Sequence, residues 1–373
     1  MNGSADVVII GGGIVGISAA YFLSEAGVRD IVVLEQTTVG AGATGRAAGV
    51  MLVQSGSDAD LSFQLEAIAV HRRFHEELGT DLRATGSLLL WRSPGDAQAA
   101  RDRLGFHADR GIIVEALGPD DLRREFPYLA ADDVVLGTYT GVDQWATPLA
   151  TVQRLADAVR GRGVVIREGA RVVDVETDGN RVQRVVTQDG GMAAGSVINA
   201  AGAWARDLGE LNGVRLAVSP RKRQVFVLES PPGVPSDSAF ILEEEDDFYC
   251  KTRAEGLIMV CGQPPGETLD DVVEWGYLDD ALSRTERRIP AARSMPIVGA
   301  WAGIRPVSPD GKPSLGPAAG LEGYYVAGGF GGQGFTQGPL GGRLVAELIT
   351  TGRPSLDLAP FRPDRAVRSP RPR

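Results

Sequence analysis

Cysteine, histidine and positive charge are all scarce in this 373-residue chain. Two cysteines cannot form the disulfide framework of a small secreted protein, and with only three histidines they provide no zinc-ligand set. The net charge of −10 argues against nucleic acid or an anionic membrane as the main partner, because both require a clustered basic surface. Long apolar runs are also absent, so we expect no segment that crosses a membrane.

We also expect no targeting leader. The first predicted strand begins within about six residues, which leaves no room for a charged start, an apolar stretch and a cleavage site. We therefore expect a cytoplasmic protein. Residues 362–373 are basic and rich in proline, and we expect a flexible, solvated tail there.

Both cysteines fall in one predicted hairpin, at residues 248–262. A turn at Glu255 and Gly256 would place Cys250 opposite Cys261 across the two strands. Even so we expect free thiols, since a reducing compartment keeps such pairs open.

Residues 6–36 contain four features of a dinucleotide-binding βαβ unit at the correct spacing. An apolar strand at residues 7–10 runs into the pattern GxGxxG where a helix opens, and a second apolar strand at 31–34 precedes an acidic residue. The glycines permit a tight turn, a close approach to a pyrophosphate and tight helix–strand packing. The carboxylate can hold a ribose hydroxyl and repels a 2′-phosphate, so FAD or NAD is favoured over NADP. The residues expected to contact the dinucleotide here are Gly11, Gly13, Ile14, Val15, Gly16, Glu35 and Gln36.

The length exceeds what one hydrophobic core usually supports, so we expect two domains. Their order along the chain is interleaved. A Rossmann-like dinucleotide-binding domain is predicted from residues 1–84, 147–216 and 296–361. Residues 85–146 and 217–295 show strands with polar alternation, which predicts a second domain built on a large, mostly antiparallel sheet. The fold class is therefore α/β.

Three distant segments resemble one family: GATGRAAGVM at 42–51, VINAAGAWA at 197–205, and WAGIRPVSPDGKPSLG at 301–316 with the glycine-rich stretch that follows it. They are similar to the FAD-dependent D-amino acid oxidase-like superfamily, in its glycine oxidase and sarcosine oxidase branch. The resemblance covers nearly the whole chain. It implies FAD as the cofactor, a substrate domain beside the FAD domain, and oxidation of a C–N bond next to a carboxylate.

The arginine of the GIRP turn, Arg305, is the residue that anchors the substrate carboxylate in that family. Pro306 restricts the backbone and fixes where the guanidinium points, and a planar fork can bind a carboxylate through two hydrogen bonds. A structural salt bridge within the loop is the alternative. Tyr249 matches a tyrosine placed over the substrate, and Lys251 would share its strand face; either can also be an ordinary strand residue.

The glycine-rich turn at 328–334 is expected to lie against the flavin ring, with the following helix directing its N-terminus at the flavin. Relatives commonly carry a histidine in this turn, whereas Gln333 stands here and cannot carry charge near neutral pH. Arg46 can neutralise a pyrophosphate or point to solvent.

The segments that resemble the family contain neither Cys nor His, so we expect FAD to be bound non-covalently. The remaining cofactor residues implied by the resemblance are Arg46, Ala47, Ala48, Gly49, Val172, Ala201, Gly202, Gly303, Arg305, Gly331, Gly332, Gln333, Gly334, Phe335 and Thr336.

The histidines are not expected to act in the site. The spacing of apolar residues predicts a helix from about residue 58 to 78, which contains His71 and His75. These two have a spacing that can hold zinc, but no third ligand is evident and the helix pattern predicts a solvated face for both. His107 lies in another polar helical stretch. We therefore expect no metal and no histidine base, with hydride passing from a neutral amine directly to the flavin.

The expected reaction converts a small amino or imino acid, such as glycine, sarcosine or proline, to an imine that hydrolyses, with oxygen as acceptor. A dehydrogenase that uses a quinone or a partner protein, a 2-hydroxy acid oxidoreductase of the same fold, and a FAD-binding scaffold are the alternatives. The expected partners are a small carboxylate-bearing amine and the acceptor, without nucleic acid or membrane. The particular amine, its stereochemistry and the oligomeric state, including a homo-oligomer, stay open.

Overall fold

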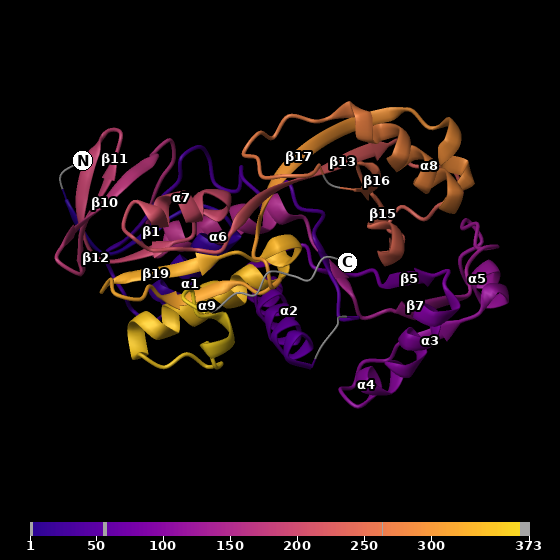
Figure 1. Cartoon of the computed structure of the whole chain (residues 1–373), viewed down its shortest axis with the longest axis horizontal. Coiled ribbons are helices and arrows are strands. Elements are labelled where there is room, and N and C mark those ends of the chain that lie inside the picture. The colour runs from indigo at the N-terminus through magenta and orange to yellow at the C-terminus, as the bar shows by residue number, and fades with distance from the viewer. Residues whose placement is uncertain (1–2, 55–57, 263, 366–373) are drawn as a thin grey trace.

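The computed structural model describes residues 3–54, 58–262 and 264–365, and it contains two large sheets (Figure 1). The first sheet has the order β10-β11-β12-β1-β2-β9, and β19 joins it by pairing with β12 and β18. Strand β1 pairs in parallel with β2 and with β12, as a βαβ unit requires. Its strands are β1 (Ser4–Ile10), β2 (Ile31–Leu34), β9 (Val165–Arg167), β10 (Val172–Asp178), β11 (Arg181–Thr187), β12 (Gly190–Asn199), β18 (Ser314–Pro317) and β19 (Tyr324–Gly328).

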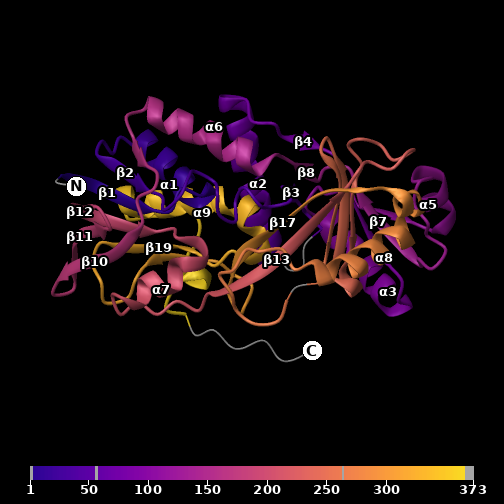
Figure 2. The same ribbon diagram turned by 90° about the horizontal axis from the view of Figure 1, so that it is seen from above.

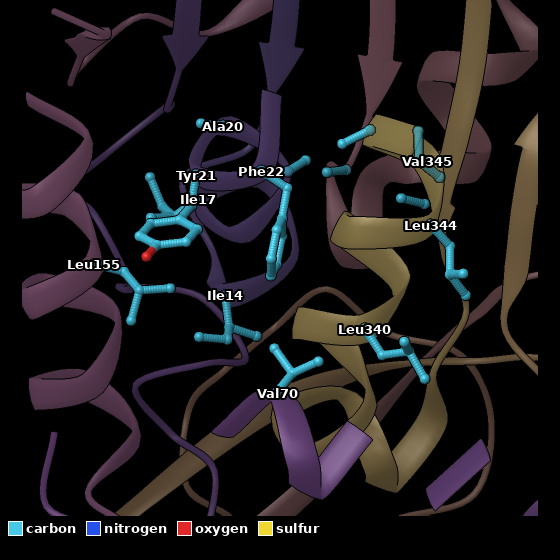
Figure 3. Packing of buried hydrophobic residues seen from close by; sticks show 14 of the residues in the cluster. Ile14, Ile17, Ala20, Tyr21, Phe22, Val70, Leu155, Leu340, Leu344 and Val345 are labelled. Atoms are coloured by element: carbon cyan, nitrogen blue, oxygen red, sulfur yellow. The ribbon is translucent and has the colours of Figure 1, made fainter. Parts of the chain in front are cut away.

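Residues 7–10 of β1 are buried on both faces of the sheet, which explains why this run is entirely apolar. Val7 and Ile9 pack into a core with α1 (Ile14–Glu25), α2 (Asp58–Leu78), α6 (Pro148–Gly161) and α9 (Gly334–Thr351). Figure 3 shows Ile14 and Ile17 of α1 between Leu155 of α6 and Leu340 of α9. Val8 and Ile10 pack on the opposite side with α7 (Ala205–Glu210).

The second sheet has the order β17-β13-β16-β15-β14-β5-β7-β6. Every neighbouring pair is antiparallel except β14 with β5, which confirms the predicted sheet type. The strands are β5 (Ser87–Trp91), β6 (Glu115–Leu117), β7 (Leu136–Thr140), β13 (Ser219–Leu228), β14 (Phe240–Glu243), β15 (Phe248–Arg253), β16 (Gly256–Cys261) and β17 (Ile297–Val307). Helices α3 (Pro94–Asp102), α4 (Leu104–Ala108), α5 (Pro119–Glu125) and α8 (Leu278–Arg288) accompany this sheet.

One face of the second sheet carries its main core and is closed by α8. Phe226, Cys250 and Met259 point to this side. Arg288 of α8 donates hydrogen bonds of 2.6 and 2.9 Å to Glu243 of β14, and both side chains are fully buried. The other face carries Val225 and Val260, which pack with Ala48 of the loop that follows β2.

Two long strands, β13 and β17, connect the parts of the molecule (Figure 2). They pair from Ser219 with Val307 to Leu228 with Ile297. The proposed domain boundary at residue 296 thus separates β17 from the sheet with which it pairs, because hydrogen bonding to β13 holds the strand there. A small sheet of β3 (Val50–Met51), β8 (Gln144–Trp145) and β4 (Arg83–Ala84) lies at the same junction.

The predicted hairpin of β15 and β16 forms, but its register differs from the expectation. Arg253 pairs with Gly256, so the turn comes one residue earlier than predicted. As a result Cys250 lies opposite Met259, and Cys261 lies opposite Phe248. Both cysteines are buried free thiols.

The described residues include no helix long and apolar enough to cross a membrane. Within the same ranges no group of three or more His, Cys, Asp or Glu side chains is arranged to hold a metal ion. Of the predicted tail, residues 366–373 lie outside the described part, whereas Arg362 forms an ion pair with Asp364 and Arg365 with Asp310.

Candidate functional site

The turn between β1 and α1 has room for glycine only. Gly11 has a φ of +113°, and a Cβ built on it would lie 2.3 Å from the carbonyl oxygen of Ala200. A Cβ on Gly16 would lie 2.0 Å from the carbonyl oxygen of Gly11. Gly13 is the N-cap of α1, and Ile14 donates its N–H to the Thr44 hydroxyl at 3.0 Å, with Val15 next along the helix. Helix α1 thus begins at the carboxyl end of the sheet, where dinucleotides bind in such folds.

Glu35 stands directly after β2 and next to this turn. Its carboxylate accepts the Gly12 N–H at 2.7 Å and the Thr37 N–H at 2.9 Å, while Gln36 beside it is half-buried. Ala170 donates its N–H to the Glu35 carbonyl oxygen at 2.8 Å, which brings the segment leading into Val172 to the same end of the sheet. The structure therefore brings the predicted ribose and adenine contacts together.

The predicted flavin loop at residues 42–49 is fixed by two tryptophans from different elements. Trp301 of β17 donates its indole N–H to the Arg46 carbonyl oxygen at 3.0 Å, and Trp145 of β8 donates to that of Ala48 at 2.9 Å. Ala47 lies between these anchored residues, and a Cβ on Gly49 would lie 2.1 Å from the carbonyl oxygen of Ala146. The guanidinium of Arg46 pairs with Asp271, and both side chains are partly exposed.

A third segment reaches the same place from the end of β12. Asn199 accepts the Ala201 N–H at 3.2 Å and donates to the Tyr324 hydroxyl at 2.9 Å. Gly202 begins a short 3-10 helix with a φ of +57°. These contacts set Ala201 beside Gly11, on the edge of the nucleotide turn.

The glycine-rich turn before α9 forms a 3-10 helix over Gly331–Gln333, and α9 begins at Gly334. Gly332 and Gln333 are exposed, whereas Phe335 and Thr336 are buried in the helix. Gln333 accepts a hydrogen bond of 3.4 Å from Gln64 of α2, and Gln64 also accepts one of 3.0 Å from Gln337. The open backbone at this turn fits a flat ring lying against it.

His71 departs from its expected solvated position. The side chain is 2% exposed, and its Nε2 lies 3.0 Å from the Phe335 carbonyl oxygen and 3.2 Å from that of Thr336. Burial lowers the pKa of His71 to about 4, so the ring is neutral and donates from Nε2 to the first turn of α9. His107 is buried as well, in a small pocket with Trp91 and Thr138, because α4 turns this residue inward. His75 is exposed.

The face of the second sheet that meets the flavin loop carries the predicted substrate residues. Val225, Tyr249 and Trp301 share an apolar cluster on this face with Ala48. Arg305 extends from the end of β17, and a Cβ on Gly332 would lie 3.3 Å from its Nη1 atom. The predicted carboxylate anchor is thus next to the glycine-rich turn.

Burial and a second arginine, Arg223, shift the pKa values of the side chains on this face. Burial lowers the pKa of Arg305, and repulsion from the Arg223 guanidinium lowers it further. Burial raises the pKa of the Tyr249 hydroxyl, whereas Arg223 and Arg305 act in the opposite direction. The face therefore favours an anionic ligand that can compensate guanidinium charge.

Lys251 is held away from such a ligand by its own partners. Its ammonium donates to the Ser238 carbonyl oxygen at 2.6 Å and to Asp237 at 3.2 Å, and the side chain is fully buried. Burial lowers the pKa of Lys251. Gly303, by contrast, sits at the flavin loop, where a Cβ would lie 3.1 Å from Cβ of Arg46.

Three residues of this site were not predicted from the sequence: Gln64, Trp145 and Arg223. For Arg223 the one available signal was strand alternation, which places it on the same face as Val225. The others belong to no motif, and only the tertiary structure brings them to the site.

Taken together, the glycine turn, Glu35 and the open turn at Gly332 fit an elongated dinucleotide with a ring at one end. A family model described as FAD dependent oxidoreductase matches residues 6–348. Glycine oxidase from Geobacillus kaustophilus is 29% identical over 95% of this chain and 96% of its own length. Its crystal structure superposes with a TM-score of 0.90, covering 98% of this chain and 100% of that one.

Two further similarities concern dehydrogenases. The L-proline dehydrogenase structure from P. horikoshii has a TM-score of 0.91 at 25% identity, over 97% of this chain and 98% of that one. Dimethylglycine dehydrogenase from Rattus norvegicus is 28% identical over 97% of this chain but only 45% of its own length, so the chain spans less than half of that relative. The chain belongs to the FAD dependent oxidoreductase family, and FAD is its cofactor.

Proposed function

We propose that the protein oxidises the C–N bond of a small amino or imino acid of the glycine, sarcosine or proline type. The observation that carries this proposal is the position of Arg305 beside Gly332, which sets a carboxylate anchor next to the turn that faces the flavin ring. A carboxylate held there extends its α-carbon toward the ring. Relatives named glycine oxidase and L-proline dehydrogenase support the same substrate class.

In this proposal FAD supplies the acceptor for the hydride that leaves the α-carbon, and the chain's own residues position the substrate. Arg305 binds the carboxylate through its planar fork. Tyr249 of β15, on the same face of the sheet, covers the substrate. The buried apolar cluster of Val225 and Val260 excludes water, so a neutral amine is favoured. The resulting imine is then hydrolysed by water to an oxo acid or aldehyde.

Oxygen is the proposed electron acceptor. A second candidate, transfer to a quinone or a partner protein, is favoured by Gln333, because an amide beside the flavin cannot supply the positive charge that assists oxygen reduction. Bound FAD is proposed to be dissociable, since no cysteine or histidine occurs in the loop at 42–49 or the turn at 328–334. Release of all flavin on acid precipitation would test this point.

The reaction is tested by mixing the FAD-loaded protein anaerobically with glycine, sarcosine, proline, D-alanine, L-alanine and lactate while following visible absorbance. Bleaching by one of the amines is the expected result, and readmitting air then separates oxidase from dehydrogenase. Bleaching by lactate alone would identify a 2-hydroxy acid oxidoreductase, because Arg305 serves either substrate. A flavin that none of the compounds reduces would contradict the proposal.

A further inference from the structure

A second arginine lies on the face of the second sheet that carries Tyr249 and Arg305, close to the predicted carboxylate anchor. Arg223 of β13 pairs with Gly303 of β17, and Arg305 is two residues further along that strand. Residues two apart in a strand share a face, so the two arginines are diagonal neighbours on one side of the sheet. The Arg223 guanidinium carbon also lies 5.8 Å from the centre of the Tyr249 ring.

Arg223 is already occupied by a carboxylate of the protein. Both of its terminal nitrogens donate to Asp247, one of them at 2.7 Å, and Nη1 also donates to the Gly262 carbonyl oxygen at 2.8 Å. The Arg223 side chain is 7% exposed, whereas that of Asp247 is 58% exposed. The aspartate thus covers the guanidinium from the open side of the face.

The backbone at Asp247 is adapted to this position. Its φ of +48° makes it the only residue other than glycine with a left-handed backbone in the described part of the chain. Asp and Asn adopt this conformation more readily than other side chains. Asp247 is also close enough to influence both Arg305 and Tyr249 electrostatically.

We propose that the Arg223–Asp247 pair sets the charge selectivity of the substrate site: the site accepts amines that carry one carboxylate and rejects those that carry two. Asp247 occupies the guanidinium that a second carboxylate would need, and its own negative charge repels such a ligand. This inference rests on the proposed function, since it takes Arg305 as the anchor of the first carboxylate. It makes Asp247 a specificity-determining residue.

Two thioethers provide the test without any turnover. (Methylthio)acetate and thiodiacetate replace the nitrogen of sarcosine and iminodiacetate by sulfur, and they differ by one carboxylate. Their dissociation constants follow from the change that each causes in the visible absorbance of the FAD-loaded protein. The wild-type protein should bind the monoacid at least about tenfold more tightly, and tighter binding of the diacid would overturn the proposal.

Asp247→Asn removes the charge and retains a side chain that tolerates the left-handed backbone. The ratio of the two dissociation constants should shift by about tenfold or more toward thiodiacetate, because Arg223 becomes available to its second carboxylate. Asp247→Gly is the second variant, since glycine also accepts this φ. An unchanged ratio in a folded variant would overturn the proposal.

The double variant Arg223→Gln/Asp247→Asn is the matched control. It removes both charges together, so no buried guanidinium is left without its aspartate, and the gain for thiodiacetate should disappear. A gain that persists without Arg223 would assign the selectivity to another group. If the shift is found but no amine reduces the flavin, the charge selectivity holds and the proposed reaction fails, so the two failures are distinguishable.

Discussion

At the scale of single residues, the geometry of Arg305 gives the most direct prediction. Arg305→Lys keeps a positive charge but loses the planar fork, so KM for the amine substrate should rise by about ten- to a hundredfold while the bound-flavin spectrum stays normal. Steady-state kinetics and absorbance spectra measure both. Arg181→Lys, in an exposed ion pair with Glu322 on the first sheet, is the control and should leave KM unchanged. An unaltered KM in Arg305→Lys would remove the anchor role.

Asp143 gives a prediction about pH. It is 1% exposed, it accepts the Val53 N–H at 2.7 Å and the Ser87 hydroxyl, and burial raises its pKa to about 7. Between about pH 4 and pH 7 the folded state therefore holds a proton on Asp143 that the unfolded state has released. The contribution of Asp143 to the free energy of unfolding is complete below about pH 4 and is lost as the pH rises toward 7.

The Asp143→Asn variant isolates this effect, because the amide oxygen can still accept the Val53 N–H without titrating. Relative to the wild type, the free energy of unfolding of the variant should improve steadily from pH 4 to pH 7 and then become constant. Urea denaturation at a series of pH values measures this difference. A difference that does not depend on pH would show that the carboxylate is ionised throughout.

Residues within strong local patterns could be predicted from the sequence, and residues defined by distant contacts could not. Gly11, Gly16 and Glu35 stand at fixed offsets in a βαβ unit, so their spacing alone indicates what each of them does. Arg223 and His71 lie outside such patterns. The polar neighbours of His71 along the helix suggested solvent, but α9 buries it with its carbonyl groups.

At the scale of elements, the crossing of α1 and α9 depends on small residues. A Cβ on Gly342 would lie 2.7 Å from the Ala19 nitrogen and 2.8 Å from the Val15 carbonyl oxygen. Gly342→Ala should therefore lower the free energy of unfolding by about 1–3 kcal/mol, although alanine favours a helix intrinsically. Thermal or urea denaturation would show this loss. Gly105→Ala in α4, where a Cβ meets nothing within 4 Å, is the control and should be neutral or stabilising.

The helices and strands could be predicted well from the spacing of apolar residues. The pairing of the strands could be predicted less well. The spacing of apolar residues predicted a helix at 58–78, which is α2 as observed. The β15–β16 register was wrong because a shift of the turn by one residue changes every cross-strand partner, and the local sequence did not distinguish the two turns. The assignment of β17 to the second sheet likewise depends on its pairing with β13 rather than on its own sequence.

At the scale of the whole molecule, the cofactor should act as a stabilising ligand. Residues expected to contact FAD come from β1, the 42–49 loop, the end of β12 and the start of α9, so FAD bridges distant parts of one chain. At a hundred times its dissociation constant, FAD should stabilise the apoprotein by about 2.7 kcal/mol and raise its melting temperature.

Tryptophan fluorescence during heating measures this shift. Riboflavin, which lacks the adenosine diphosphate half, is the control and should give a smaller shift at equal concentration, because it cannot reach the Gly13 and Glu35 end of the site. Equal shifts for both ligands would contradict the predicted contacts at the βαβ unit.

The interleaving of the first sheet has a consequence for biosynthesis. β12 pairs with β1 on one side and with β19 on the other, so the sheet joins strands from the start, the middle and the last part of the sequence. At about 5–20 residues per second, β1 and β2 emerge from the ribosome about 15–60 s before β19. Assembly of the nucleotide pocket is therefore a late event in the synthesis of these residues, and FAD can be loaded only onto a chain that has been translated as far as α9.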